Sequence, residues 1–427
     1  MKIVQVIHGY PLRYNAGSEV YTQTLCQALA KEHEVSVFTR EENPFAEDFS
    51  LRIETDPDDS RIPLYLINIP SEKYRLAYTL PKVDAIFSEI LEKLCPDVVH
   101  VGHLNHLSTS LVEVVAKKKI PLVFTLHDYW LMCPRGQFLQ RRHPRTLELW
   151  PLCSGQENRK CALHCFSDSF SGAEADAAGD EACWTKWVDR RMEHLRKIAS
   201  YVDLFIAPSR YLLERFVTDF HLPREKIVYL DYGFDRSRLQ KRQREAKEPF
   251  TFGYIGTHIP AKGIQHLIEA FSQLKSRALL RIWGRARPSN TDGLKMLAQT
   301  STLPIEWMGE YVNSRIMQDV FNQLDAIVVP SIWVENSPLV LHEALEAKVP
   351  IITARAGGMA EYIEHGVNGL LFEHRNPKDL ALQMQDFLDH PEKAAALSAR
   401  GYLQSADGHI PDIATHAQAI VEIYRAL

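Results

Sequence analysis

Two successive series of short, strand-like segments, separated by helical segments, constrain the fold of this chain most strongly. The first series lies at residues 3–7, 34–39, 64–69, 97–101, 121–126, 204–207 and 227–230. The second lies at residues 250–255, 279–283, 325–329, 350–353 and 370–372. Parallel strands need a crossover between them, usually a helix, so each series predicts a doubly wound α/β domain with a mostly parallel sheet.

The length of the chain also calls for two domains, because 427 residues exceed one ordinary hydrophobic core. Residues 236–249 are highly charged and lack apolar periodicity, which predicts a linker. We therefore expect one Rossmann-like domain over residues 1–235 and a second over residues 250–405. Residues 406–427 follow the second domain, and a last helix is expected there from about residue 412.

Charge and hydropathy exclude several classes of partner. The formal net charge is −5, so the chain has no excess of basic residues that would favour nucleic acid. No segment approaches the roughly 18 consecutive apolar residues of a membrane span. Residues 3–7 predict a strand and not a signal peptide. We expect a cytoplasmic protein whose contact with a membrane, if any, is peripheral and at its inner face.

A helix start after a buried strand is the most distinctive local pattern. Residues 325–329 predict a buried parallel strand. Ser337 and Pro338 predict the N-cap and the first residue of a helix that continues from about residue 339 to 348. The first N–H groups of a helix lack intrahelical acceptors and lie at the positive end of the helix dipole. Such a helix start binds phosphate.

Two carboxylates accompany this helix start, Glu335 just before it and Glu343 more than a turn inside. They can accept hydrogen bonds from sugar and ribose hydroxyls on the two sides of a bound diphosphate. Together with Pro330-Ser331 before them and Ala344 after them, they resemble the E-x7-E motif of the retaining GT-B glycosyltransferases of family 4. In that family the first Glu lies beside the donor sugar and the second holds the ribose. The alternative is an amphipathic helix whose acids are only solvated.

The resemblance implies a GT-B architecture, in which two Rossmann-like domains face each other across a cleft. The first domain would lie on the acceptor side, the second would bind the nucleotide sugar, and the C-terminal helix would return to the first domain. It also implies that the segment after Glu335 contacts the donor, through its backbone N–H groups except at the proline. The donor-binding residues of this segment are Asn336, Ser337, Pro338, Leu339 and Val340.

A lysine is expected to supply positive charge to the donor site. Lys262 follows the first strand of the second series and opens the next predicted helix (residues 264–274), where its ammonium can neutralise a diphosphate leaving group. A solvated lysine in a turn is the alternative. The family usually has an Arg five residues before this Lys, and Thr257 stands there in this chain. Arg285, Arg287 or the N–H groups of a helix start are alternatives for the missing charge.

Two segments of the first domain also resemble the family. Gly17, in the segment A-G-S-E, resembles the glycine-rich loop after the first strand and predicts a contact with the donor. A plain helix start capped by Ser18 is the alternative. His127, in the segment H-D-Y-W after residues 121–126, resembles the H-D-x-W segment of the family. There the histidine donates a hydrogen bond to a sugar hydroxyl or positions the acceptor, and a purely structural histidine is the alternative.

Residues 134–197 interrupt the alternation and predict a long insert on the acceptor side. A loop of this length is usually a lid, a binding segment or disorder. It contains Trp184, Trp187 and a set of basic residues, which are Arg135, Arg141, Arg142, His143 and Arg145. Basic residues interleaved with tryptophan favour contact with an anionic lipid-linked acceptor or a membrane face, and a solvated lid is the alternative.

The seven cysteines are an odd count in a chain that otherwise has intracellular character, so disulfides are not expected to hold the fold. Most of them cluster near the insert. Two interpretations of Cys133, Cys153, Cys161 and Cys165 stay open, a structural zinc site or separate buried thiols. Neither makes the cluster catalytic.

The combined motifs predict a retaining glycosyltransferase that moves a sugar from a nucleotide diphosphate sugar to an acceptor hydroxyl. Catalysis is assigned to His127, Glu335 and Lys262. The motif residues contain no Asp-x-Asp, so Lys262 and helix dipoles are expected to replace a divalent cation, and no cofactor is required. The expected acceptor is a sugar, a lipid-linked sugar or a small molecule, in the synthesis of cell-surface polysaccharide or glycoconjugates.

Two other functions stay open. A nucleotide-sugar epimerase shares the two-domain architecture, and Thr257 favours a non-catalytic GT-B subunit. The joint presence of Lys262, Glu335, Glu343 and His127 argues against a subunit without chemistry. A dehydrogenase is disfavoured, because the first strand is not followed by G-x-G-x-x-G and the second does not end in the acid that binds the ribose of NAD.

Overall fold

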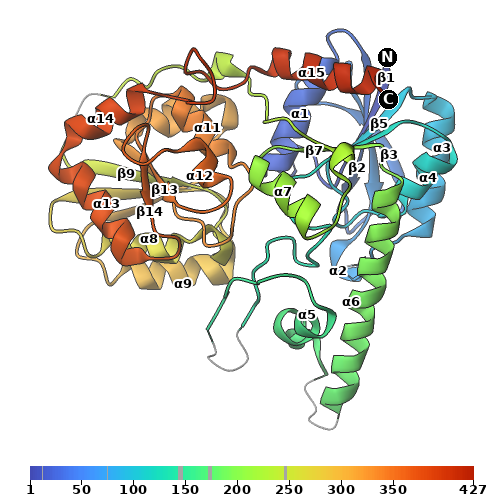
Figure 1. The fold of residues 1–427 in the computed structure, drawn as a ribbon, viewed down its shortest axis with the longest axis horizontal. Helices are drawn as coiled ribbons and strands as arrows, with labels where there is room; N and C mark the ends of the chain where they lie inside the picture. The colour runs from blue at the N-terminus through green and yellow to red at the C-terminus, as the bar shows by residue number, and fades with distance from the viewer. Residues whose placement is uncertain (12, 75, 143–147, 172–175, 245–247) are drawn as a thin grey trace. The chain divides into compact units, whose positions relative to one another are not determined.

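The structure is a computed structural model that describes residues 1–11, 13–74, 76–142, 148–171, 176–244 and 248–427 (Figure 1). Its internal contacts divide the chain into two units. Unit 1 comprises Met1–Phe234 and Pro411–Leu427, and unit 2 comprises Asp235–Ile410. The roles predicted for the two domains, acceptor side and donor side, stay predictions.

Unit 1 is built on an eight-stranded sheet with the order β3-β4-β2-β1-β5-β6-β7-β8. The strands are β1 (Lys2–Ile7), β2 (Glu34–Glu41), β3 (Leu51–Thr55), β4 (Pro63–Asn68), β5 (Val98–Val101), β6 (Leu122–Thr125), β7 (Leu204–Ala207) and β8 (Ile227–Tyr229). All neighbouring pairs are parallel except β3 with β4. The strands of the sheet centre are buried throughout, as expected for a parallel sheet covered on both faces.

Helices cover both faces of the unit 1 sheet (Figure 1). They are α1 (Gly17–Leu29), α2 (Ser71–Tyr74), α3 (Pro81–Leu94), α4 (Leu111–Lys117), α5 (Asn158–Cys165), α6 (Ala177–Ser200), α7 (Arg210–Thr218) and α15 (Ile413–Arg425). Helix α3 shows how they dock: Val83, Phe87, Ile90 and Leu91 recur at helical spacing and are all buried.

Unit 2 is built on a six-stranded sheet with the order β11-β10-β9-β12-β13-β14, and all its described pairs are parallel. The strands are β9 (Phe250–Ile255), β10 (Ala278–Trp283), β11 (Ile305–Gly309), β12 (Ala326–Val329), β13 (Ile351–Ala354) and β14 (Leu370–Phe372). The helices are α8 (Ile264–Phe271), α9 (Pro288–Ala298), α10 (Ile316–Asp319), α11 (Leu339–Glu346), α12 (Met359–Tyr362), α13 (Pro377–Asp389) and α14 (Pro391–Ala399). The predicted pair of doubly wound α/β domains is therefore confirmed.

Each sheet has a topological switch point beside its first strand. In unit 1 the chain adds β2 and β4 on one side of β1, and then returns to add β5 to β8 on the other. In unit 2 it adds β10 and β11 on one side of β9, and then β12 to β14 on the other. Doubly wound sheets bind ligands at the carboxyl ends of the strands at such a point. The loops after β1 and β5, and those after β9 and β12, are thus the places to look for a site.

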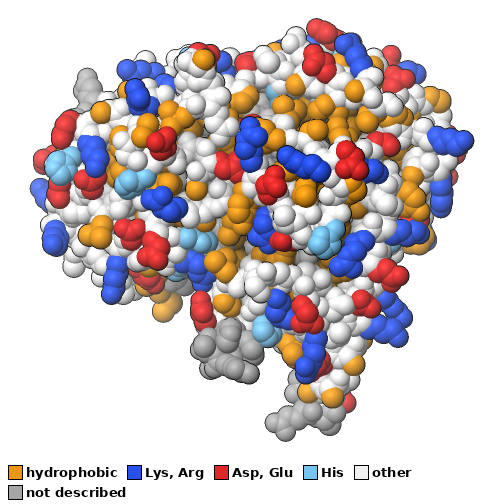
Figure 2. Space-filling view, in the orientation of Figure 1, with side chains coloured by type: hydrophobic (Ala, Val, Ile, Leu, Met, Phe, Trp, Pro, Cys, Tyr) orange, Lys and Arg blue, Asp and Glu red, His pale blue; other side chains and the backbone are white. Residues whose placement is uncertain are grey.

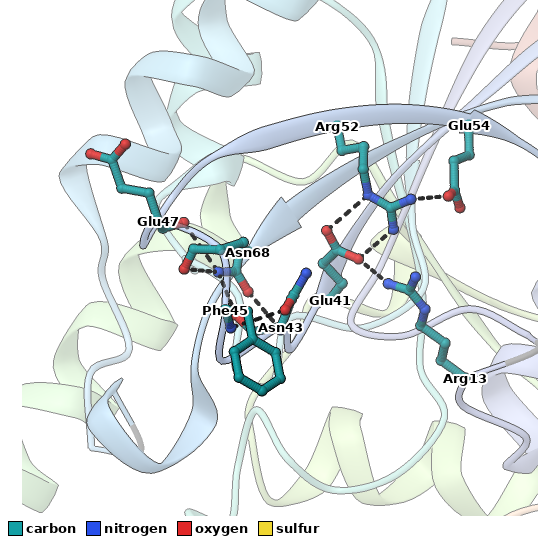
Figure 3. Close-up of polar contacts among 9 residues, drawn as sticks. Arg13, Glu41, Asn43, Phe45, Glu47, Arg52, Glu54 and Asn68 are labelled. Carbon is teal, nitrogen blue, oxygen red and sulfur yellow. Dashed lines mark hydrogen bonds and ion pairs between the residues drawn. The ribbon is translucent and has the colours of Figure 1, made fainter.

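Two strands, β3 and β11, were missed by the sequence analysis because they lie at sheet edges and bury none of their residues fully. Polar contacts hold β3 in place (Figure 3). Glu41 accepts hydrogen bonds from Arg13 and Arg52, and Arg52 also pairs with Glu54. The side chain of Asn68 donates to backbone carbonyls of the loop that precedes β3. An edge strand fixed by such contacts carries no apolar run that a sequence pattern would reveal.

The insert predicted over residues 134–197 as a long loop is wrong for much of its length, since the described part contains α5 and most of α6. Helix α6 buries Trp184, Val188, Met192 and Leu195 at helical spacing. Trp184 stacks on Phe166 with ring centres 4.9 Å apart. The segment that interrupts the alternation of strands and helices in the sequence therefore contains two helices, and α5 packs beside α6 (Figure 1).

The basic and aromatic side chains of the insert make different kinds of contact. Trp187 packs edge-on against Phe166 and donates through its indole to the carbonyl of Leu76, so it contributes to packing. Arg141 pairs with Asp168. The predicted contacts of His143 and Arg145 lie outside the described residues.

The described residues of the predicted linker, 236–244 and 248–249, fall within unit 2. Arginines of this segment bind the domain that follows it. Arg244 holds Asp325 through two hydrogen bonds of 2.9 and 2.7 Å. Arg236 lies 3.3 Å from Glu346. The arginines of this charged segment therefore form ion pairs with carboxylates elsewhere in unit 2.

The last helix, α15, packs on α1 within unit 1. His416 Nε2 lies 2.8 Å from the hydroxyl of Tyr21. Deeper in the unit, the hydroxyl of Tyr424 lies 2.6 Å from Nδ1 of His100 and accepts a hydrogen bond from Gln5. Three buried polar contacts thus fix the C-terminal helix, one to α1 and two to the sheet of unit 1.

Charges of both signs are interspersed on the face drawn in Figure 2. Such a surface agrees with the small formal net charge. In the part of the chain that the structure describes, no helix combines the length and the apolarity that crossing a membrane would need.

Candidate active site

The loops after β9 and β12 lie directly against each other at the switch point of unit 2. The amide of Ile332 donates to the carbonyl of Ala261 at 2.9 Å. Gly263 has a φ of +72°, and a Cβ at this position would lie 1.9 Å from the carbonyl oxygen of Pro330. Only glycine allows this backbone conformation and this close approach together. The close contact between the two loops places Lys262, the residue before Gly263, beside the start of the E-x7-E segment.

Lys262 and Glu335, both predicted to be catalytic, form an ion pair there. Nζ of Lys262 lies 2.7 Å from Oε1 of Glu335, and the hydroxyl of Ser331 donates to the same oxygen at 2.6 Å. Glu335 is 5% exposed, and its carbonyl accepts from the amide of Gly358. The Lys262 side chain keeps 31% of its surface exposed and lies 5.8 Å from the ring centre of Trp333. The carboxylate is therefore fixed while the ammonium can still reach a ligand.

Glu343, the predicted ribose ligand, lies inside α11 and pairs with a residue that the sequence analysis did not select. Nη2 of Arg238 lies 2.5 Å from Oε1 of Glu343. Nη1 of Arg238 donates to the side chain of Asn313 at 3.0 Å. Burial, together with the charge of Glu343, raises the pKa of the nearby Tyr311. Arg238 lies in the segment predicted as linker, and no local motif marks it.

The start of α11 differs in detail from its prediction. The helix begins at Leu339, but Pro338 is its N-cap with an extended ψ of 119°, and no side chain caps it. The prediction of Ser337 as the cap and Pro338 as the first helical residue is wrong by one position. The helix also ends two residues early, because Lys348 has a left-handed φ of 55°. The N–H groups of Leu339 and Val340 consequently open the helix and have no intrahelical acceptors.

The loop that carries Thr257 contacts the next loop of the sheet edge. The amide of His258 donates to the carbonyl of Arg285 at 2.9 Å. The side chain of Arg285 lies 3.4 Å from Glu310, whereas the side chain of Arg287 is exposed. Arg285 is thus the arginine whose backbone joins the loop of Thr257, and its guanidinium is already paired with a carboxylate.

His127, the third predicted catalytic residue, follows β6 in unit 1. Its Nδ1 lies 2.6 Å from the hydroxyl of Tyr232, on which its ring also stacks. Burial lowers the pKa of His127 well below its ordinary value, and charge on His103 and His100 would lower that pKa further. The imidazole is therefore neutral near pH 7, and it can take part in hydrogen bonds but not act as a fixed cation.

Other histidines that the sequence analysis did not select lie near His127. His8 follows β1 and His103 follows β5, the two strands that flank the switch point, and the ring centres of the two histidines are 4.5 Å apart. Nε2 of His8 lies 3.4 Å from Glu19, and Nε2 of His103 lies 3.4 Å from Asp128. Their position directly after these strands is a signal that could have identified them.

Gly17 is the first residue of α1 and is exposed. Ala16 is the N-cap, and it provides no side-chain cap. The hydroxyl of Ser18 instead donates to Glu19 at 2.8 Å, so the alternative in which Ser18 caps this helix is wrong. The helix start at Gly17 is thus formed without a capping side chain, and its contact with a donor stays a prediction.

Comparison with known proteins agrees with this arrangement. Residues 235–404 match the family described as "Glycosyl transferases group 1", and residues 15–167 match the one described as "Glycosyltransferase Family 4". Among curated relatives, a GDP-mannose-dependent monoacylated alpha-(1-6)-phosphatidylinositol monomannoside mannosyltransferase of Corynebacterium glutamicum is 28% identical over 246 residues, which cover 53% of this chain and 63% of that protein. A GDP-mannose-dependent alpha-(1-6)-phosphatidylinositol monomannoside mannosyltransferase of Mycobacterium tuberculosis is 26% identical, over 61% of this chain and 77% of its own length.

Solved structures match over the whole chain. The sucrose-phosphate synthase of Thermosynechococcus elongatus aligns with a TM-score of 0.71 at 16% identity, over 100% of this chain and 99% of its own. HepE of Anabaena, solved in complex with UDP and glucose, aligns with a TM-score of 0.67 at 18% identity, over 100% of both chains. Residues 235–404 thus resemble the group 1 glycosyltransferases and residues 15–167 resemble glycosyltransferase family 4, and the chain has the two-domain fold of the GT-B glycosyltransferases.

Proposed function

We propose that the protein transfers a hexosyl unit from a nucleotide diphosphate sugar to an acceptor hydroxyl, with retention at the anomeric carbon. The observation that carries the proposal is the ion pair of Lys262 with Glu335 beside the uncapped start of α11. A cation, free N–H groups and a fixed carboxylate then meet at the switch point of unit 2, where a doubly wound sheet binds its ligand.

Each of these groups has a role in the proposal. The donor diphosphate accepts hydrogen bonds from the first N–H groups of α11, and Lys262 stabilises the negative charge that develops on it as the glycosidic bond breaks. Glu335 steadies the sugar and its developing positive charge. Glu343 accepts hydrogen bonds from the ribose hydroxyls, and Arg238 holds that carboxylate in place. Lys262 and the helix would thus take the part that a divalent cation takes in other enzymes.

The carboxyl edge of the unit 1 sheet suits the contacts of a sugar substrate. Neutral imidazoles can both donate and accept hydrogen bonds, and burial lowers the pKa of His127 so that its ring is neutral near pH 7. His8 and His103 add two more rings that lie beside the carboxylates Glu19 and Asp128. We therefore propose that His127 binds a hydroxyl of the donor sugar or positions the acceptor, and that its neighbours select an acceptor rich in hydroxyl groups.

The class of acceptor is proposed from the relatives. Several are named as mannosyltransferases that depend on GDP-mannose and act on phosphatidylinositol mannosides, and HepE was solved with UDP and glucose. We propose an acceptor that is a sugar or a sugar-bearing lipid of the cell surface, which this protein reaches at the inner face of a membrane. The base of the donor nucleotide is left to experiment.

A thermal-shift panel of UDP-, GDP-, ADP- and dTDP-sugars tests the donor site, with the native protein and Glu343→Ala run in parallel. We expect one nucleotide family to raise the melting temperature of the native protein, and the shift to be lost in Glu343→Ala. Glu306→Ala, which removes an exposed carboxylate on the edge strand β11, is the matched control and should retain the shift.

Turnover distinguishes a transferase from the alternatives. With the donor identified, release of the nucleoside diphosphate should depend on an added acceptor, continue in the presence of a chelator, and give a product that keeps the donor's anomeric configuration. Donor binding without turnover would instead favour the non-catalytic subunit, which Thr257 suggests. Conversion of one nucleotide sugar into another would favour the epimerase.

A further inference from the structure

Four of the seven cysteines line one small enclosed cavity in unit 1. They are Cys133, Cys153, Cys161 and Cys165, and the cavity between them has a volume of about 10 Å³. A space of this size holds about one water molecule or one ion. Cys26, Cys95 and Cys183 do not line it. The four thiols are unbonded to one another, since every cysteine of the structure is free.

Local structure brings these four side chains together from three segments. Cys161 and Cys165 are four residues apart in α5, so both lie on its buried face. The amide of Cys153 donates to the carbonyl of Phe138 at 2.7 Å, and a β-bridge joins Leu139 to the residue before Cys153. Cys133 ends a turn in which its amide donates to the carbonyl of Tyr129 at 2.7 Å. Regular backbone contacts therefore fix the positions of the four cysteines around the cavity.

Two arginines beside the cavity, the partly buried Arg135 and the buried Arg191, form no ion pair with a carboxylate in the described part of the chain. Arg191 is 2% exposed, and its guanidinium donates to the carbonyl of Trp130 at 2.9 Å. It interacts electrostatically with Cys133, with the carboxylate of Asp128 and more weakly with Cys161. Arg135 lines the cavity, and its Nη1 is buried without a hydrogen-bond partner. A buried charge normally has a compensating partner, and four neutral thiols do not provide one.

We propose that Cys133, Cys153, Cys161 and Cys165 bind one Zn²⁺ ion as a structural site of four thiolates, with Arg135 and Arg191 as its charge partners. Four cysteine ligands fill the tetrahedral coordination of zinc and leave no open position, which is the pattern of a structural site. Zinc with four thiolates carries two net negative charges, and the two guanidinium groups balance them. The amino-terminal part of the insert would then be held together by the metal.

Binding would require the thiols to turn further into the cavity and to lose their protons to solvent as the zinc–sulfur bonds form. As they stand in the described residues, no three side chains of His, Cys, Asp or Glu lie at the spacing that ligates one ion. Cysteine has one side-chain torsion with staggered alternatives, through which each sulfur can turn toward the cavity. Each zinc–sulfur bond would then be about 2.3 Å long.

The metal content of the full chain tests this site. Protein purified under reducing conditions with zinc supplied should contain one zinc per chain, and Cys161→Ser/Cys165→Ser should contain none. Cys95→Ser and Cys183→Ser are matched controls, because both cysteines are exposed and lie outside the cavity, and both variants should keep the zinc. Absence of zinc from the native protein, zinc retained by the double variant, or iron in its place would overturn the proposal.

A second measurement needs no variant that removes a ligand and therefore holds even if the double variant does not fold. Cobalt added to the metal-free native chain should give the intense near-ultraviolet absorption of four thiolate–cobalt bonds, and zinc should abolish it. Arg135→Met should weaken zinc binding by about 10- to 100-fold, as loss of an outer-shell partner does, whereas Arg159→Met, which removes an exposed arginine of α5, should not. A disulfide among the four cysteines in the native protein would overturn the proposal.

Discussion

Nη2 of Arg238 and Oε1 of Glu343 lie 2.5 Å apart in unit 2, and both side chains are largely buried, with 15% and 6% of their surface exposed. The carboxylate proposed to bind ribose is therefore paired and oriented before any nucleotide arrives. A ligand need not order this side chain on binding, which lowers the entropic part of the binding free energy.

Removal of Arg238 should destabilise unit 2. Arg238→Met leaves the buried carboxylate of Glu343 without its cation, and we expect the free energy of unfolding to fall by about 3 kcal/mol. Arg281→Met, which removes a more exposed ion pair with Glu306 on the same sheet, should cost at most about 1 kcal/mol. Urea unfolding of the full chain measures both. The double variant Arg238→Met/Glu343→Leu should recover most of the loss, and equal losses in the single and double variants would contradict the pairing.

Lys262 should affect turnover more than the binding of the nucleotide. Its ammonium is proposed to stabilise charge that appears only as the diphosphate leaves, so Lys262→Ala should lower kcat by about 100- to 1,000-fold with a much smaller change in the Kd of the nucleoside diphosphate. Lys275→Ala, which removes an exposed lysine after α8, is the matched control and should behave as the native protein. Steady-state kinetics and equilibrium binding separate the two quantities. A loss confined to binding would assign Lys262 to anchoring alone.

The sequence predicted those site residues that belong to short contiguous motifs and missed those whose partners lie far away in the chain. Glu335, Glu343 and Lys262 belong to strand–loop–helix patterns that are contiguous in the chain, and the structure brings Lys262 to Glu335 because their loops end neighbouring strands. Arg238 was missed because its partner lies 105 residues away and the charged run around it resembles a linker. Pairing across the fold is a property of topology that no local pattern contains.

Among the strands and helices, too, those with a clear local pattern were predicted and those without one were missed. Buried strands such as β7 and β14 were predicted with their exact bounds, because a continuous apolar run between turns is itself the signal. The edge strands β3 and β11 have no such run. Helix α6 was missed because its buried face includes the charged Arg191, which interrupts the apolar periodicity of its 24 residues. In each case the tertiary surroundings, and not the local composition, decide the outcome.

Acid should destabilise the protein through its buried histidines. Burial lowers the pKa of His100 to about 3 and the pKa values of His106, His266 and His416 to about 4. Their pKa in the unfolded chain is about 6.5. Below this pH the unfolded state binds protons that the folded state excludes, so stability is complete above about pH 6.5 and decreases as the pH falls toward 4. Each histidine contributes up to about 1.4 kcal/mol per pH unit.

The midpoint of urea unfolding, measured from pH 7.5 to 4.5, checks this expectation. His100→Gln should reduce the slope of stability against pH, even though it also lowers stability at pH 7.5 by removing contacts with Thr125 and Tyr424. His390→Gln, which removes an exposed histidine, should leave the slope unchanged. An unchanged slope in His100→Gln would show that this histidine titrates alike in the folded and unfolded chains.

Gly263 should control donor binding through the position of its loop. In Gly263→Ala the left-handed φ becomes strained, and the added Cβ meets the carbonyl oxygen of Pro330 at 1.9 Å, so the loop that carries Lys262 must move away from Glu335. We expect the Kd of the donor to rise at least about tenfold, since a loss of about 1.4 kcal/mol or more in loop placement corresponds to that factor. Gly293→Ala is the matched control, because Gly293 lies inside α9 with nothing within 4 Å, and the substitution should raise stability by about 1 kcal/mol and leave donor affinity unchanged. Isothermal titration of both variants with the donor decides the point, and a native affinity in Gly263→Ala would mean that the donor site does not depend on the contact between the loops after β9 and β12.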